Sequence, residues 1–191
     1  MTKNAKYEAI VVGTSAGGLN ALFVLLETLP ANFPLPIIIV QHRSKDKNDL
    51  LEEVLQNKCK VKIKQADEKE KIEKGVVYIA PPDYHVLIEN DLTLSLSADE
   101  YVQFSRPSID VLFESAAGVY KDKLIGIILT GANSDGASGI RLIKANDGLT
   151  IAQKPEEAFS PVMPSAAIKT NAVTHIWPLS KIRDFLLTLN N

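Results

Sequence analysis

The sequence has one cysteine, Cys59, among its 191 residues, so no disulfide can form within the chain. A lone cysteine is typical of a protein in a reducing compartment, and we expect a cytoplasmic location. The polar start of the chain has no secretory hydrophobic core, and no apolar run is long enough to cross a bilayer. These absences predict a soluble protein that does not insert into membranes.

Charge of one sign and clustered metal ligands are also lacking. The net charge of -2 gives no general attraction to nucleic acid, so we expect no nucleic-acid partner. His42, His85 and His175 are far apart in the sequence, and no Cys/His pair has the spacing of metal ligands. We therefore expect no metal site.

What the sequence does contain is an ordinary globular composition with alternating patterns. A hydrophobic content of 46% over 191 residues suits a single domain with a sizeable core. Short β-branched runs alternate with helical patterns, and several runs are apolar on both faces, which is typical of a covered parallel sheet. The pattern predicts an α/β fold that is doubly wound, with a mainly parallel sheet, helices on both faces and an inserted β-hairpin.

The predicted elements follow from these patterns. The strands of the sheet are expected at residues 9–12, 37–41, 61–65, 76–80, 124–130, 149–153 and 173–177. The hairpin is expected at 85–89 and 92–97, with its turn at 90–91. Helices are expected at residues 19–29, 49–57, 108–119, 136–145, 164–170 and 180–189, with Ser108 and Ser180 as N-caps.

The most informative motif lies between the first strand and the first helix. The letters GTSAGG at residues 13–18 fit Gly-x-Ser-x-Gly, a turn that lifts a nucleophilic serine above a sheet edge. Ser15 is also a favoured N-cap type, so nucleophile and helix cap both remain open from this motif alone. A dinucleotide fingerprint fits poorly, because Ser15 occupies the place of its second glycine. A phosphate-binding loop is excluded, because the turn has no lysine.

Two further polar residues follow predicted strands at the same edge of the sheet. His42 comes after the second strand, and Asp135 comes after the strand at 124–130. Serine, histidine and aspartate are the parts of a nucleophile, a general base and a carboxylate that orients the base. Taken singly, His42 can be structural and Asp135 can cap the helix that it introduces. Their conjunction with Ser15 favours a catalytic triad.

Six sequence blocks are spread over nearly the whole chain. Three contain the candidate triad: VGTSAGG at residues 12–18, VQH at 40–42 and LTGANSDGASG at 129–139. Three connect them: YIAPPDYH at 78–85, RPSIDVLF at 106–113 and AFSPVMPSAA at 158–167. The first three resemble the catalytic blocks of the chemotaxis protein-glutamate methylesterase family, and the connecting blocks are similar to that family too.

The resemblance implies hydrolysis of glutamate γ-methyl esters on the cytoplasmic helices of chemoreceptors, with release of methanol. Some members of the family also deamidate receptor glutamines. It implies Ser15 as nucleophile, His42 as base and Asp135 as the residue that orients the base, with no cofactor. The backbone N–H groups of Ala16 and Ala132 are the expected oxyanion donors.

The substrate pocket is less clearly marked. Thr14, Asn133, His85 and Arg106 are its candidate residues, and Arg106 can line the mouth or pair internally. The family commonly has Met-Gly where this chain has Ala132 and Asn133, so the pocket wall is expected to differ. Asn133 is expected to keep the turn, since asparagine tolerates left-handed dihedral angles.

Typical members carry an N-terminal receiver domain, and here the catalytic pattern begins within the first ten residues. We therefore expect residues 1–191 to form a single methylesterase catalytic domain with no receiver domain. The alternatives are a receptor-binding adaptor without catalysis and an anion-binding module of the same fold.

Overall fold

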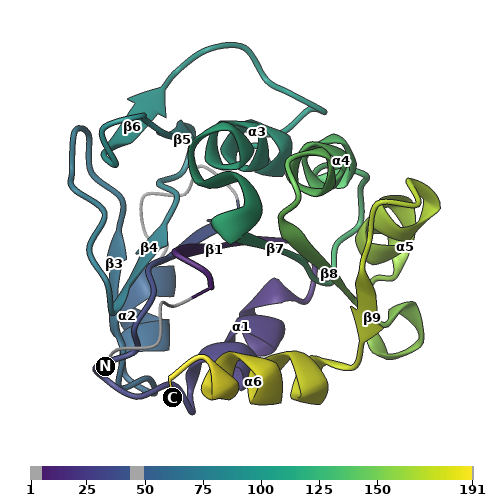
Figure 1. Cartoon of the computed structure of the whole chain (residues 1–191), viewed down its shortest axis with the longest axis horizontal. Helices are drawn as coiled ribbons and strands as arrows, with labels where there is room; N and C mark the ends of the chain where they lie inside the picture. The colour runs from purple at the N-terminus through teal and green to yellow at the C-terminus, as the bar shows by residue number, and fades with distance from the viewer. Residues whose placement is uncertain (1–5, 44–49, 191) are drawn as a thin grey trace.

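The computed structural model describes residues 6–43 and 50–190, and it shows one parallel sheet with helices on both faces (Figure 1). The sheet has seven strands in the order β3-β4-β2-β1-β7-β8-β9, and every neighbouring pair is parallel. The predicted doubly wound α/β fold is confirmed.

The seven strands of the sheet are β1 (Ala9–Thr14), β2 (Ile37–Gln41), β3 (Lys62–Gln65), β4 (Val76–Ile79), β7 (Leu124–Ile128), β8 (Leu149–Gln153) and β9 (His175–Trp177). The strands at the centre of the sheet are buried on both sides. Along β2 the side chains alternate between two cores: Ile38 and Val40 face one, and Ile37 and Ile39 face the other. This alternation explains the unbroken run of apolar residues.

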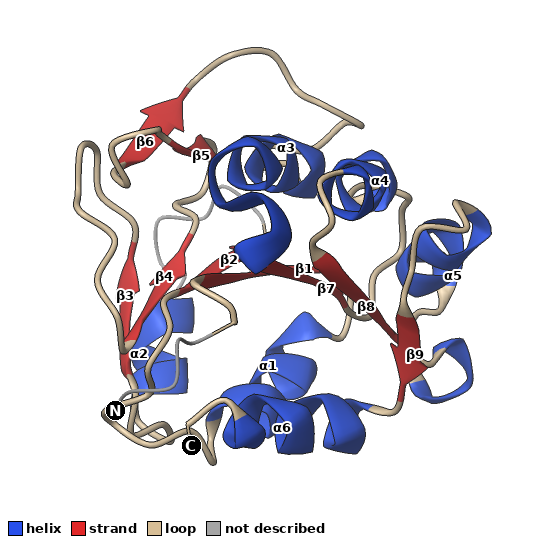
Figure 2. Ribbon diagram, viewed as in Figure 1, coloured by secondary structure: helices blue, strands red, loops and turns tan. Residues whose placement is uncertain are grey.

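The two helical layers each cover one of these cores (Figure 2). The helices α3 (Ile109–Tyr120), α4 (Ala137–Ala145) and α5 (Val162–Lys169) pack on one face. The helices α1 (Gly18–Leu26), α2 (Leu51–Gln56) and α6 (Leu179–Thr188) pack on the other face. Short 3₁₀ turns span Lys121–Lys123 and Pro155–Glu157.

The predicted hairpin is confirmed as a separate two-stranded sheet of β5 (His85–Ile88) and β6 (Leu94–Ser97). It packs on α3 at one end of the main sheet (Figure 2). Its connection is longer than the two residues predicted, because Leu92 takes a φ of 62° and its N–H bonds to the carbonyl of Glu89. A β-bridge between Lys71 and Thr93 joins it to the segment before β4.

Several predicted boundaries are wrong by a few residues. Helix α1 ends at Leu26 and α6 begins at Leu179, so Ser180 lies inside its helix and does not cap it. Strand β7 ends at Ile128, because the N–H of Thr130 turns to the Gln153 side chain. The predicted start of the second helix, Asp49, lies outside the described residues. In the part of the chain that is described, no helix has both the length and the apolarity needed to span a bilayer.

Candidate active site

The three strands that carry the predicted triad lie side by side in the middle of the sheet. Strand β1 pairs with β2 on one side and with β7 on the other. The chain leaves β1 for α1 on one face of the sheet and leaves β7 for α4 on the other face. The carboxyl ends of β1 and β7 therefore form a topological switch point, where open α/β sheets bind ligands. Ser15, His42 and Asp135 follow the ends of these strands, so the predicted gathering at one sheet edge is present.

The backbone of the serine turn is held from both neighbouring strands. The N–H of Ser15 donates to the carbonyl of Thr130 at 2.9 Å, and the side-chain Nε2 of Gln41 donates to the carbonyl of Ser15 at 2.9 Å. The same Gln41 nitrogen also donates to the carbonyl of His42 at 2.8 Å. One buried amide therefore fixes the backbone of the serine and of the histidine together.

Two glycines make this turn possible. Gly17 has a φ of 80°, in the left-handed region that favours glycine, and it stands at the N-cap of α1. At Gly18 a Cβ would lie 1.9 Å from Oε1 of Gln41 and 2.7 Å from Oγ1 of Thr14, so no side chain fits there. Close packing against Gln41 thus requires glycine at position 18.

The side chain of Ser15 does not cap the helix. The N-cap of α1 is Gly17, and no side chain caps that helix by a hydrogen bond. The residue is half-buried, and among the described residues its Oγ has no hydrogen-bond partner. The helix-cap interpretation of Ser15 is wrong, because the chain turns two residues before the helix begins.

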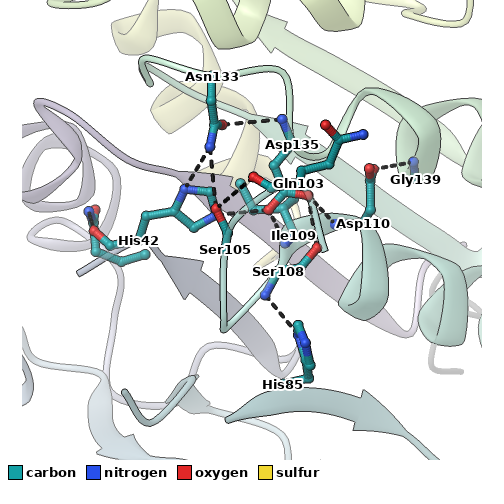
Figure 3. Close-up of polar contacts among 11 residues, drawn as sticks. His42, His85, Gln103, Ser105, Ser108, Ile109, Asp110, Asn133, Asp135 and Gly139 are labelled. Carbon is teal, nitrogen blue, oxygen red and sulfur yellow. Dashed lines mark hydrogen bonds and ion pairs between the residues drawn. The ribbon is translucent and has the colours of Figure 1, made fainter. Parts of the chain in front are cut away.

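His42 and Asp135 form a close pair. Nε2 of His42 lies 2.8 Å from Oδ2 of Asp135, and the exposed fraction of the His42 side chain is 12% (Figure 3). Since a carboxylate only accepts, the proton between them belongs to Nε2 in the neutral ring. Nδ1 of His42 is then the nitrogen left to take a proton. Trypsin-like proteases use the two ring nitrogens the other way round.

The carboxylate of Asp135 is fully buried and saturated with donors. Besides His42, it accepts from Oγ of Ser108 at 2.9 Å and from the backbone N–H groups of Ile109 at 2.7 Å and Asp110 at 3.0 Å. Burial alone would raise the pKa of Asp135, but the hydrogen bonds from His42, Asp110 and Ile109 outweigh it and hold the pKa below its usual value. Asp135 is therefore a carboxylate at neutral pH.

Asp135 caps a helix, but not the one that it introduces. It accepts from the first turn of α3, and Asp110 in that turn accepts the N–H of Gly139 in α4 at 2.7 Å (Figure 3). Asp135, which precedes α4, thus caps α3, and Asp110, in the first turn of α3, caps α4. Ser108 stands at the N-cap of α3, yet its hydroxyl caps nothing there and donates to Asp135. The predicted N-cap position of Ser108 is confirmed, but the carboxylate of Asp135 accepts the first-turn N–H groups in place of its hydroxyl.

Asn133 lies beside the histidine. Its Oδ1 accepts the N–H of Asp135 at 3.2 Å, so its Nδ2 faces the other way, 3.3 Å from Oγ of Ser105 and 3.5 Å from Nδ1 of His42 (Figure 3). Its φ is not positive, so the expected left-handed turn is wrong; Gly136, with a φ of 93°, supplies that conformation. Within the described residues no hydrogen bond joins Ser15 to His42, and the donor that contacts Nδ1 is Asn133.

The two predicted oxyanion donors are not engaged by other described groups of the protein. Within the described residues the backbone N–H groups of Ala16 and Ala132 make no hydrogen bond to the protein, whereas the neighbouring N–H of Gly131 donates to the carbonyl of Ser160 at 3.1 Å. The N–H of Met163 in turn donates to the carbonyl of Gly131 at 2.9 Å. This pair of bonds holds the loop after β7 against the segment before α5.

A cleft of about 370 Å³ opens at His42. Its other wall is the segment 101–107, which includes Phe104, Ser105 and Arg106. Arg106 both lines the cleft and pairs internally: its Nε and Nη2 donate to Oδ1 of Asp83 at 2.9 and 2.7 Å. The side chain of Phe104 is 99% exposed at the rim.

Two predicted pocket residues lie elsewhere. Thr14 is fully buried, and its hydroxyl donates to the carbonyl of Thr130 at 2.8 Å, so it ties β1 to the end of β7. His85 is 2% exposed, and both of its ring nitrogens contact backbone groups. Neither side chain reaches the cleft: Thr14 ends β1 and His85 begins β5, and both side chains point into the core.

Sequence reasoning missed three residues of this site: Gln41, Ser108 and Phe104. Gln41 ends an otherwise apolar strand, and that polar residue in a buried run was the available signal. Among the described residues no group of three or more His, Cys, Asp or Glu side chains is placed to hold a metal ion.

Comparison with known proteins gives consistent matches. The family profile described as CheB methylesterase matches residues 10–186. A putative protein-glutamate methylesterase/protein-glutamine glutaminase of Leptospira interrogans is 53% identical, covering 96% of this chain and 95% of its own. A probable protein-glutamate methylesterase of Borreliella burgdorferi is 40% identical, covering 93% of this chain and 48% of its own. The chain thus spans nearly all of the first relative and about half of the second.

The fold comparison agrees with the sequence comparison. The crystal structure of the Thermotoga maritima CheB methylesterase catalytic domain matches with a TM-score of 0.91 and 32% identity, covering 96% of this chain and 98% of that one. These matches confirm the resemblance stated from the motifs and the classification of the chain as an enzyme.

Proposed function

Because the chain belongs to the CheB methylesterase family, we propose that it hydrolyses glutamate γ-methyl esters on the cytoplasmic helices of chemoreceptors and releases methanol. Its single domain would work in the cytoplasm, where those helices lie. The observation that carries this proposal is the His42–Asp135 pair, 2.8 Å apart, at the sheet edge where Ser15 follows β1.

In the proposed reaction Ser15 attacks the ester carbonyl while Nδ1 of His42 takes the hydroxyl proton. Asp135 holds the ring through Nε2 and stabilises its positive charge. The carbonyl oxygen becomes an oxyanion, which the N–H groups of Ala16 and Ala132 stabilise. His42 then returns the proton to the departing methoxide, which leaves as methanol and gives the acyl-enzyme. Water repeats the attack and leaves glutamate.

The same groups support the deamidation of receptor glutamines. An amide in place of the ester gives the same acyl-enzyme, because His42 then protonates the amide nitrogen, which leaves as ammonia. The name of the Leptospira relative includes protein-glutamine glutaminase, and this supports the second activity as part of the proposal.

A protein substrate suits the surface around the cleft. Phe104, which lines the cleft, is 99% exposed, and Phe159 is 82% exposed. Phe159 packs against the serine turn, since a Cβ on Gly17 would lie 2.5 Å from the Cβ of Phe159. Exposed aromatic side chains beside a site are typical of a surface that binds another protein.

The test is methanol release from a methylated chemoreceptor fragment. We expect Ser15→Ala to lower turnover by roughly 10⁶-fold, because the triad acts as a unit. We expect Asp135→Asn to lower it by roughly 10⁴-fold, because the ring loses its correct tautomer. Ser180→Ala is the matched control, since Ser180 is exposed on α6 and its side chain does not cap that helix.

Equal release by wild type and Ser15→Ala would contradict the triad. Receptor binding that persists with no release by the wild type would instead support the adaptor without catalysis. Anion binding that is unaffected by Ser15→Ala, again with no release, would support the anion-binding module.

A further inference from the structure

His85 is a buried histidine that the proposed mechanism does not use. It begins β5, it is 2% exposed, and both ring nitrogens are engaged. Nδ1 lies 3.1 Å from the backbone nitrogen of Ser108, and Nε2 lies 3.0 Å from the carbonyl oxygen of Glu100. A backbone N–H only donates and a carbonyl only accepts. The ring is therefore neutral, with its proton on Nε2.

The partner of Nδ1 is the residue that holds the catalytic carboxylate. The N–H of Ser108 donates to His85, and the hydroxyl of Ser108 donates to Oδ1 of Asp135 at 2.9 Å (Figure 3). Ser108 is fully buried, and its φ and ψ of -107° and 138° are extended. With its N–H fixed by His85, the peptide of Ser108 is held in one orientation. Its hydroxyl is then directed at Asp135.

The partner of Nε2 lies in the segment that forms the cleft wall. Glu100 immediately precedes residues 101–107, which line the cleft with His42. His85 thus joins the hairpin, the wall of the cleft and the N-terminus of α3. A hydrophobic residue of the same size would fill the space but would leave the N–H of Ser108 buried without an acceptor.

We propose that His85 is a positioning residue for the catalytic aspartate: it orients Ser108, Ser108 orients Asp135, and Asp135 orients His42. This inference rests on the proposed function of the triad. His85 does not touch the substrate. Its removal is expected to act mainly on the general base, because its bond toward the cleft wall reaches only the backbone carbonyl of Glu100, which precedes that wall.

The kinetic test compares His85→Ala with His85→Gln in methanol release from the methylated receptor fragment. We expect His85→Ala to lower kcat by roughly tenfold, with KM within about twofold of wild type, because a misplaced base slows chemistry and not binding. Glutamine carries an acceptor and a donor on one side chain, so we expect His85→Gln to recover most of kcat. Titration of active Ser15 with a serine-directed inhibitor corrects for misfolded enzyme.

A double-mutant cycle separates positioning from a general structural role. If His85 acts through Asp135, His85→Ala in the Asp135→Ala background changes kcat by less than about twofold. A tenfold loss in both backgrounds would overturn the proposal. His175→Ala is the matched control, because His175 lies on the edge strand β9, stacked on Trp177 and away from the triad.

Two further measurements keep the proposal testable if His85→Ala folds poorly. Ser108→Ala removes one hydroxyl and is expected to lower kcat like His85→Ala; wild-type kcat would overturn the relay. NMR measures how fast the proton between Nε2 of His42 and Asp135 exchanges with water. We expect slow exchange in wild type and in His85→Gln, and faster exchange in His85→Ala. If Ser15→Ala and Asp135→Ala retain activity, the proposed function fails by itself. Separately, an exchange rate of this proton that is the same in His85→Ala as in wild type would overturn the positioning role.

Discussion

The buried carboxyl of Asp110 allows a stability prediction with a definite sign. Asp110 lies in the first turn of α3, is 8% exposed, and accepts the N–H of Gly139 at 2.7 Å. Burial raises the pKa of Asp110 from 3.8 to about 6, and the nearby charge of Asp135 adds to the rise. The folded protein therefore binds a proton at Asp110 more tightly than the unfolded chain does.

The direction of the pH effect follows from this rise. The contribution of Asp110 to stability is fully present below pH 3.8 and is lost as the pH rises through about 6. A rise of this size corresponds to about 3 kcal/mol at neutral pH. Solvent at the ends of the two helices screens part of it, so we expect a penalty of about 2 kcal/mol.

The perturbation is Asp110→Asn, which removes the charge and keeps an oxygen to accept from Gly139. We expect the variant to be more stable than wild type by about 1–2 kcal/mol above about pH 7, because the added amide donor offsets part of the gain. The gain should shrink as the pH falls from about 6 to about 4. Urea unfolding across this range measures the free energy of unfolding for both proteins.

The control is Asp122→Asn, at an exposed aspartate in the 3₁₀ turn after α3. Its stability change is expected to stay within about 0.5 kcal/mol at every pH. A gain for Asp110→Asn that does not depend on pH, or a loss above pH 7, would refute the reasoning from burial.

Three other predictions concern the serine turn and the cleft. Gly18→Ala is expected to destabilise the protein by about 2–3 kcal/mol in thermal unfolding, because its Cβ would lie 1.9 Å from a side-chain oxygen. The control is Gly118→Ala in helix α3, where a Cβ would have no neighbour within 4 Å; we expect it to stabilise the protein by about 0.5–1 kcal/mol. Asn133→Ala is expected to free Nδ1 of the base and to raise the rate at which a serine-directed inhibitor labels Ser15 about threefold. Phe104→Ala is expected to raise KM for a receptor fragment about tenfold, with kcat within about twofold of wild type.

Each of these has an outcome that would contradict it. Equal stability of the two glycine variants would mean that the turn relaxes freely around a new side chain. Slower labelling of the Asn133 variant would mean that this amide supports the base and does not occupy it. A KM for the Phe104 variant equal to that of wild type would mean that this side chain does not contact the receptor.

The sequence predicted those features that depend on local pattern. The apolar run Ile37–Gln41 predicted a strand covered on both faces, and the position of Ser15, His42 and Asp135 after strands predicted their meeting at one edge. Both follow from the geometry of parallel strands, whose carboxyl ends lie together. The roles of the three residues remain predictions until their variants are assayed.

The sequence did not predict which partners the polar side chains choose. From the sequence, Ser108 and Asp135 are each expected to cap the helix that follows them, because serine and aspartate side chains commonly bond to nearby backbone groups. In the folded protein they bond each other across 27 positions of sequence. The prediction of His85 and Thr14 as pocket residues is wrong for a related reason. A sequence pattern indicates which residues lie in a strand, but packing between the layers decides where the side chain at each end of the strand points.

The amide of Gln41 has a consequence for how the enzyme can adapt. Because one nitrogen bridges the carbonyls of Ser15 and His42, the two backbones form one rigid body at the sheet edge. In the proposed mechanism, bringing the hydroxyl of Ser15 to His42 then requires rotation about a side-chain bond and no hinge in the main chain. Substrates of different shape must be accommodated on the opposite wall, where the segment 101–107 closes the cleft. In this architecture the groups proposed to react stay fixed, and the accommodation of different substrates falls to a segment that carries no step of the proposed chemistry.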